Sequence, residues 1–145
     1  MAIEGEYEPS PTDWVRKHVE KITASGTTES ATIRGRPVVL MTMRGARSGK
    51  VRKVPVMRVE HDGVYAVVAS RGGAPTHPLW YFNLKANPTI ELQDGREVHT
   101  YVARELDGAE RDTWWERAVA AYPDYADYQQ STTRQIPVLV LERAD

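Results

Sequence analysis

The chain has 145 residues, of which 41% are hydrophobic and 27% charged, a balance typical of a folded domain rather than a disordered segment. Its 19 basic and 20 acidic residues leave a net charge of -1, which argues against a globally basic nucleic-acid binder. The absence of cysteine excludes disulfides, thiolate metal sites and a cysteine nucleophile.

The sequence favours a cytoplasmic protein. No apolar run reaches the roughly 18 residues that a membrane-spanning helix needs. Residues 1–11 carry glutamates and no basic residue, unlike a secretory signal. We therefore expect a single domain over residues 1–145, in which residues 1–30 form an N-terminal segment with a helix.

The first predicted element is this N-terminal helix. Ser10 is expected to cap it, Pro11 to occupy its first turn and Gly26 to end it. Strands are predicted next over residues 38–43, 51–59 and 64–70, the last two joined by a hairpin at Asp62-Gly63. Pro55 places the second strand at an edge, because proline cannot donate to a ladder.

The second half of the chain continues the pattern with further strands and helices. The predicted elements are a short helix from Pro78 to Leu84, strands over residues 89–93 and 97–106 around Asp94-Gly95, a helix capped by Asp107, a tyrosine-rich helical turn over residues 124–130, and a strand over residues 136–142. Six strands with hairpin connections predict a mainly β (α+β) fold, a six-stranded antiparallel barrel with packed peripheral helices.

Charge is unevenly distributed along the chain. Residues 34–58 contain eight basic side chains and no acid, whereas the chain from Glu105 onward contains nine acids and four arginines. This pattern favours an anionic partner of the basic segment, although a solvated strand face would look the same. Aromatic residues are not interleaved with the basic ones, which argues against nucleic acid.

Three groups of residues could carry chemistry. The basic turn over residues 44–53 combines glycines with cations, as an anion site requires, but a charged hairpin turn has the same composition. Residues 70–74 place glycines between a strand and a helix, which suits close approach of a ligand or a purely structural turn. Tyr122, Tyr125 and Tyr128 share one side of a helical turn, as a substrate surface or as a packing stripe.

The sequence shows no nucleophile motif and no metal-ligand spacing, so no metal is expected. An enzyme of this kind would rely on a bound cofactor for its chemistry.

Taken together, five ordered segments resemble the actinobacterial deazaflavin-dependent nitroreductase and quinone reductase family. They are Gly45-x-Arg47-Ser48-Gly49-x-x-Arg52, Pro55, Ala69 to Ala74, Pro78 to Pro88, and Tyr122-Pro123-x-Tyr125-x-x-Tyr128. The resemblance implies a split β-barrel related to proteins that bind flavin mononucleotide. It also implies coenzyme F-420, an 8-hydroxy-5-deazaflavin with a phosphodiester and an oligoglutamate tail, as the cofactor.

The resemblance further implies the roles of individual residues. The expected cofactor-binding residues are Arg47, Ser48, Gly49, Arg52, Lys53, Val54, Pro55, Ala69, Ser70, Arg71, Gly72, Gly73, Leu79, Trp80, Tyr81, Phe82 and Asn83. The expected catalytic residues are Ser70, Tyr122, Tyr125 and Tyr128, and the same four line the substrate site together with Met57.

The implied activity is hydride transfer from reduced F-420 to an electron-poor acceptor: a quinone, an activated alkene or a nitroaromatic. A hydroxyl from Ser70 or a tyrosine would polarise the acceptor oxygen. Met57 replaces an aromatic residue of the nitroimidazole-reducing members, which favours quinone or enone reduction. The resemblance also allows a homodimer and peripheral contact with the inner face of the membrane.

Two alternatives remain at this stage. A split barrel that binds flavin mononucleotide or haem would share the fold but would not need the basic segment. A non-catalytic deazaflavin-binding module would retain the cofactor site and tolerate loss of the tyrosine hydroxyls.

Overall fold

The fold is built around one curled sheet in the computed structural model, which describes residues 3–145. The strands are β1 (Thr32–Ile33), β2 (Arg36–Arg44), β3 (Val51–Met57), β4 (Val59–His61), β5 (Val64–Val68), β6 (Thr89–Asp94), β7 (Glu97–Glu105) and β8 (Val138–Arg143). The helices are α1 (Asp13–Ser25), α2 (Leu79–Ala86), α3 (Gly108–Ala121) and α4 (Asp124–Gln130), with short 3-10 turns η1 (Thr28–Ser30) and η2 (Arg71–Gly73).

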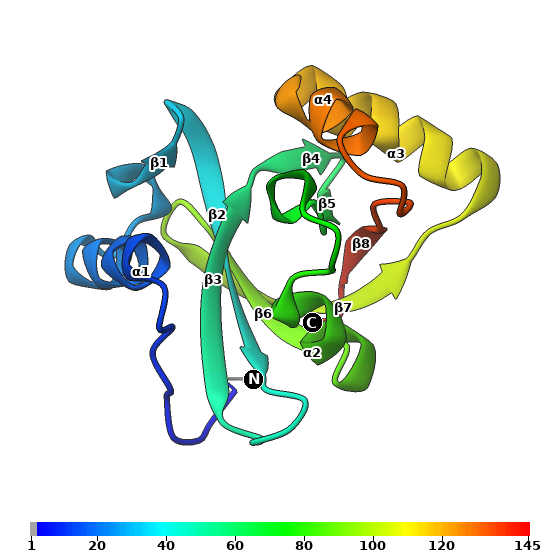
Figure 1. The fold of residues 1–145 in the computed structure, drawn as a ribbon. Coiled ribbons are helices and arrows are strands. Elements are labelled where there is room, and N and C mark those ends of the chain that lie inside the picture. Colours follow the sequence, from blue (N-terminus) through cyan, green and yellow to red (C-terminus); the bar gives the residue numbers. More distant parts are fainter. Residues whose placement is uncertain (1–2) are drawn as a thin grey trace.

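The sheet closes because one predicted strand changes partner along its length. The segment expected as one strand over residues 51–59 is interrupted at Arg58, so that β3 pairs with β2 and β4 pairs with β5. The remaining antiparallel pairs run from β2 through β6, β7 and β8 to β5, which brings the pairing back to the same segment (Figure 1).

The predicted fold class is confirmed and the strand number is corrected. The sheet has eight strands rather than six, because the break at Arg58 makes two strands of one and because β1 adds a two-residue strand beside β2. Among the described strands β3 pairs with β2 alone, as expected from Pro55.

A polar cluster fixes the break between β3 and β4. The Arg58 guanidinium donates to the Asp94 carboxylate, with Nε and Oδ2 2.9 Å apart, and the Tyr65 hydroxyl donates to the same oxygen at 2.5 Å. Asp94 begins the hairpin turn between β6 and β7, and Tyr65 lies on β5. The cluster therefore ties three parts of the barrel together at one end.

Apolar side chains pack on both faces of the curled sheet. The barrel interior is filled by side chains that include Met41, Met43, Ile90, Leu92 and Leu139. Outside it, α3 and α4 cover β4, β5 and β8, whereas α1 packs beside β2 and β3 on the other side of the molecule (Figure 1).

Several predicted boundaries differ from the structure by one or two residues, among them the start of the last strand, which is Val138 rather than Ile136. The N-terminal helix begins at Asp13 after Thr12, because the Ser10 hydroxyl accepts the Thr12 N–H at 3.1 Å in a turn before the helix. Its end at Gly26, with a left-handed φ of 77°, is as predicted. The third strand ends at Val68 because Arg71 and the glycines after it adopt positive φ angles.

Candidate functional site

The basic turn between β2 and β3 is held in one conformation by backbone and side-chain hydrogen bonds. The Gly45 N–H donates to the Lys50 carbonyl at 2.8 Å, and the Ala46 N–H donates to the Asn83 side-chain oxygen at 2.9 Å. Asn83 lies on α2, so the turn is tied to that helix. Arg47 and Ser48 are exposed on it.

Beyond the turn, alternate residues of β3 face opposite sides of the sheet. Val54 packs against the barrel interior and Pro55 is buried. Lys53 lies on the outer face, with its ammonium 5.6 Å from the centre of the Tyr7 ring. Arg52 forms an ion pair with Glu8, with Nη1 and Oε1 2.8 Å apart.

The glycine loop after β5 follows a buried Ala69 and a buried Ser70. Arg71, Gly72 and Gly73 have φ angles of 48°, 63° and 82°. A Cβ on Gly73 would lie 3.0 Å from the Tyr128 carbonyl oxygen, so glycine is required there for contact with α4. A Cβ added to Gly72 would have no neighbour within 4 Å, so the backbone at this residue faces open space.

Arg134, which precedes β8, organises this loop and was not identified from the sequence. Its guanidinium donates to the carbonyl oxygens of Ser70 at 2.6 Å, Ala74 at 2.8 Å and Ala69 at 3.1 Å. It also lies 2.9 Å from Nδ1 of His77. No motif contains Arg134, and its role arises only from tertiary contact.

The three tyrosines gather against the glycine loop. Tyr122 and Tyr125 are each only 4% exposed, Tyr128 is half-buried, and the hydroxyls of Tyr122 and Tyr128 are 2.9 Å apart. They belong to the same apolar cluster as Met57. Burial raises the pKa of Tyr122 and of Tyr125 well above the ordinary value, so these phenols are protonated at neutral pH.

Helix α2 carries large hydrophobic residues in two environments. Leu79 is 77% exposed and Phe82 is 47% exposed, whereas Trp80 and Tyr81 pack against the barrel cluster. Burial, and then the hydrogen bond from its hydroxyl to Glu105 at 2.7 Å, raises the pKa of Tyr81 to about 12.

Contacts between elements join the groups of predicted site residues in pairs. Asn83 joins the basic turn to α2, and α4 rests on η2, where the Ser131 hydroxyl donates to the Gly73 carbonyl at 3.4 Å. Lys53 lies apart from these contacts, because it lines a cavity of about 280 Å³ on the outer face of the sheet, under residues 3–7.

Two further observations concern the described residues 3–145. They contain no group of three or more His, Cys, Asp or Glu side chains that could hold a metal ion. None of the helices over this range is long and apolar enough to cross a membrane.

The curled antiparallel sheet with helices packed on its outside places the chain among the split-barrel proteins. The model of one family, described as F420H(2)-dependent quinone reductase, matches residues 14–143. The chain belongs to this family.

Individual relatives agree with this assignment. An F420H(2)-dependent quinone reductase of Mycobacterium tuberculosis is 34% identical over 110 residues, which cover 74% of each chain. A solved F420-H2 dependent reductase is 60% identical and covers 74% of this chain and 95% of its own, with a TM-score of 0.70. A structure described as a domain-swapped dimer is 57% identical and covers 92% of this chain and 100% of its own, with a TM-score of 0.73.

Proteins with little sequence identity to this chain share its fold. A haem storage protein of Vibrio cholerae is 13% identical with a TM-score of 0.59 and covers 77% of this chain and 84% of its own. The family resemblance drawn from the sequence is confirmed, and with it the expectations of an oxidoreductase and of F-420 as the family's cofactor. The alternative of a haem or flavin mononucleotide protein is not supported by the family match.

Proposed function

We propose that this chain transfers hydride from reduced F-420 to a quinone-type acceptor, using the basic turn and glycine loop for the cofactor and the tyrosines for the acceptor. The observation that carries the proposal is the family match over residues 14–143, which includes all three groups of residues. Their contacts in the fold support the assignment of roles.

The residues present fit an anionic, flat cofactor. Arg47 and Arg71 are exposed cations on the basic turn and the glycine loop. At Gly49 and Gly72 the backbone has positive φ, and a Cβ would meet nothing within 4 Å, so amides can approach a ligand closely. Arg47, Arg71 and the turn would hold the phosphodiester and tail, and residues 69–73 would contact the ring system through backbone.

Reduced F-420 supplies two electrons as a hydride when bound. Quinone reduction also needs a proton at the carbonyl oxygen, which must come from the protein or from water. Tyr128 suits this task, because it is half-buried and its hydroxyl is 2.9 Å from that of Tyr122. Its phenol would donate a hydrogen bond to the acceptor oxygen, and Tyr122 would fix its orientation.

Burial of Tyr122 and Tyr125 gives the acceptor site its apolar wall. Met57 belongs to the same cluster and offers a flexible thioether rather than an aromatic ring. This wall would exclude water from one side of the acceptor. It fits the hydrophobic ring of a quinone. Activated alkenes and nitroaromatics are further candidate acceptors, because they are electron-poor as well.

The activity is tested by mixing the protein anaerobically with reduced F-420 and the quinone menadione, and following the fluorescence of oxidised F-420. We expect oxidation to depend on both protein and quinone. A rate equal to that of the protein-free mixture, with menadione and with an enone, would refute the proposal.

A homodimer is also part of the proposal, supported by the 57% identical relative described as a domain-swapped dimer. Light scattering of the purified chain tests it, with twice the monomer mass expected.

Peripheral contact with a membrane is supported by the exposed Leu79 and Phe82 on α2. Co-sedimentation with anionic vesicles should fall when both are replaced by serine.

A further inference from the structure

An acidic segment lies along the free edge of β3, next to the basic turn. Tyr7 forms a parallel bridge with Val51, the Glu8 N–H donates to the Val51 carbonyl at 2.9 Å, and the Val51 N–H donates to the Glu6 carbonyl at 2.8 Å. Residues 6–8 therefore act as a short added strand, at the end of a segment that covers residues 3–8. We call residues 3–8 the acidic strap.

The register of this pairing matches acids with bases. Because Tyr7 is opposite Val51, Glu6 is beside Lys50 and Glu8 is beside Arg52. Glu8 Oε1 lies 2.8 Å from Arg52 Nη1, and Glu6 Oε2 lies 3.4 Å from Lys50 Nζ. One face of the strap thus neutralises two cations at the start of β3.

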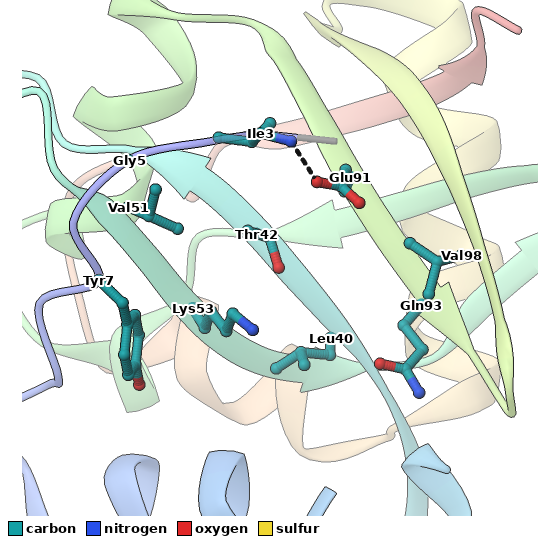
Figure 2. A pocket seen from close by; sticks show the side chains of 10 residues that line it. All are labelled: Ile3, Gly5, Tyr7, Leu40, Thr42, Val51, Lys53, Glu91, Gln93 and Val98. Atoms are coloured by element: carbon teal, nitrogen blue, oxygen red, sulfur yellow. Dashed lines mark hydrogen bonds between the residues drawn. The ribbon is translucent and has the colours of Figure 1, made fainter. Parts of the chain in front are cut away.

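The other face of the strap is anchored without the help of these carboxylates. Figure 2 shows Ile3, Gly5 and Tyr7 along the strap, with the Lys53 side chain directed into the cavity beneath it. The Ile3 N–H donates to the Glu91 carboxylate at 2.5 Å. Removing the negative charges of Glu6 and Glu8 should therefore leave the strap in place.

If the proposed function is correct, Arg52 has a second anionic partner, because it belongs to the basic turn over residues 44–53 that is assigned to the cofactor's phosphodiester and tail. That tail carries the same functional group as the strap, the glutamate carboxylate. We propose that Glu6 and Glu8 are internal competitors of the tail, and that they set how tightly the chain binds F-420 and how strongly it depends on tail length.

The strength of the ion pairs suits a competitor that can be displaced. The Arg52 side chain is 25% exposed and that of Glu8 41%, and the Lys50 and Glu6 side chains are more exposed still, at 42% and 74%. Exposed pairs of this kind are individually weak and are screened by salt. A tail with several carboxylates can therefore replace them, but its net gain in affinity is reduced by the pairs that it breaks.

The test is a fluorescence titration of the wild-type chain, the double variant Glu6→Gln/Glu8→Gln and the single variant Glu4→Gln. Glu4 is the matched control because it lies in the same strap and contacts Arg44 through its backbone carbonyl, which the substitution leaves unchanged. Each protein is titrated with F-420 carrying several glutamates and with the deazaflavin that lacks the phosphodiester and tail.

At low salt we expect the double variant to bind tailed F-420 about three- to tenfold more tightly than wild type, with the gain shrinking at high salt. Affinity for the tailless deazaflavin should stay unchanged, and Glu4→Gln should differ from wild type by less than about twofold. Equal affinity of wild type and double variant for tailed F-420, or an equal gain in Glu4→Gln, would overturn the inference alone. Absence of F-420 binding by the wild-type chain would overturn the proposed function and the inference with it.

Discussion

The guanidinium of Arg134 donates a hydrogen bond of 2.6 Å to the carbonyl oxygen of Ser70, although the two residues are 64 positions apart. The same side chain reaches the carbonyls of Ala69 and Ala74. A single arginine therefore shapes the loop that begins at Ser70 and that we assign to the cofactor ring.

Replacing Arg134 by alanine should lower the free energy of unfolding by about 2–3 kcal/mol, because hydrogen bonds from a charged donor are lost and their carbonyl acceptors are left unpaired. Chemical denaturation measures this loss. The control is Arg104→Ala, which removes an exposed arginine paired with Glu110 and Glu142 and should cost less than about 1 kcal/mol. Equal losses in the two variants would show that the loop does not depend on Arg134.

The hydroxyl pair of Tyr122 and Tyr128 leads to a prediction about turnover. Tyr128→Phe should lower kcat for quinone reduction about 10- to 100-fold with little change in the dissociation constant of F-420, because the proton donor is lost and the ring stays. Steady-state kinetics and a binding titration separate the two effects. Tyr101→Phe, a change inside the barrel, is the matched control and should keep its activity. A Tyr128 variant that loses only cofactor affinity would move this hydroxyl into the cofactor site.

His77 makes stability depend on pH. Burial, and then the charge of Arg134, lowers the pKa of His77 below its ordinary value. The unfolded chain therefore takes up a proton at His77 at pH values where the native chain does not. The free energy of unfolding should accordingly fall as pH drops below about 6.5.

Replacing His77 by glutamine removes this titration, so the variant should lose less stability than wild type between about pH 7 and pH 5.5. Denaturant unfolding at several pH values gives both slopes. Parallel slopes for the two proteins would contradict the assignment. The comparison depends only on the difference between them, since carboxylates elsewhere titrate equally in both.

The cluster of Arg58, Tyr65 and Asp94 should be a main source of barrel stability. Asp94→Ala leaves the Arg58 guanidinium and the Tyr65 hydroxyl without their shared acceptor, at a cost of about 2–4 kcal/mol in unfolding free energy. Tyr65→Phe removes one hydrogen bond and should cost about 1 kcal/mol. As a control, Asp13→Ala breaks an exposed pair with Arg16 and should cost less than about 1 kcal/mol. If Asp94→Ala lost no more unfolding free energy than Asp13→Ala, the break between β3 and β4 would not depend on the cluster.

Local signals were sufficient for much of the fold. The Asp62-Gly63 and Asp94-Gly95 hairpins, the end of α1 at Gly26 and the edge position of β3 all depend on the conformational properties of glycine or proline, which act within a few residues. The break at Arg58 could not be predicted in this way, because it depends on Asp94, which is distant in sequence.

The same limit applies to the candidate site. Spacing placed Tyr125 and Tyr128 on one helical turn correctly, whereas Tyr122 lies before it, at the end of α3. The order of motifs indicated the family, which the family match confirms. Arg134 and the acidic strap carry no such signal. An isolated arginine, and Glu6 and Glu8 in the strap, acquire a role only from the residues that tertiary folding places beside them. The resemblance implied both Lys53 and Val54 as cofactor residues, and as neighbours on a strand they face opposite sides of the sheet.

The central claim is that this barrel binds F-420 through the basic turn and the glycine loop. It is tested most directly by titrating protein from a host that makes no deazaflavin with F-420 and, separately, with flavin mononucleotide. We expect F-420 to bind at least about tenfold more tightly, and the double variant Arg47→Ala/Arg71→Ala to lose most of that preference at low salt. Equal or tighter binding of flavin mononucleotide, or an F-420 affinity unchanged in the double variant, would contradict the account.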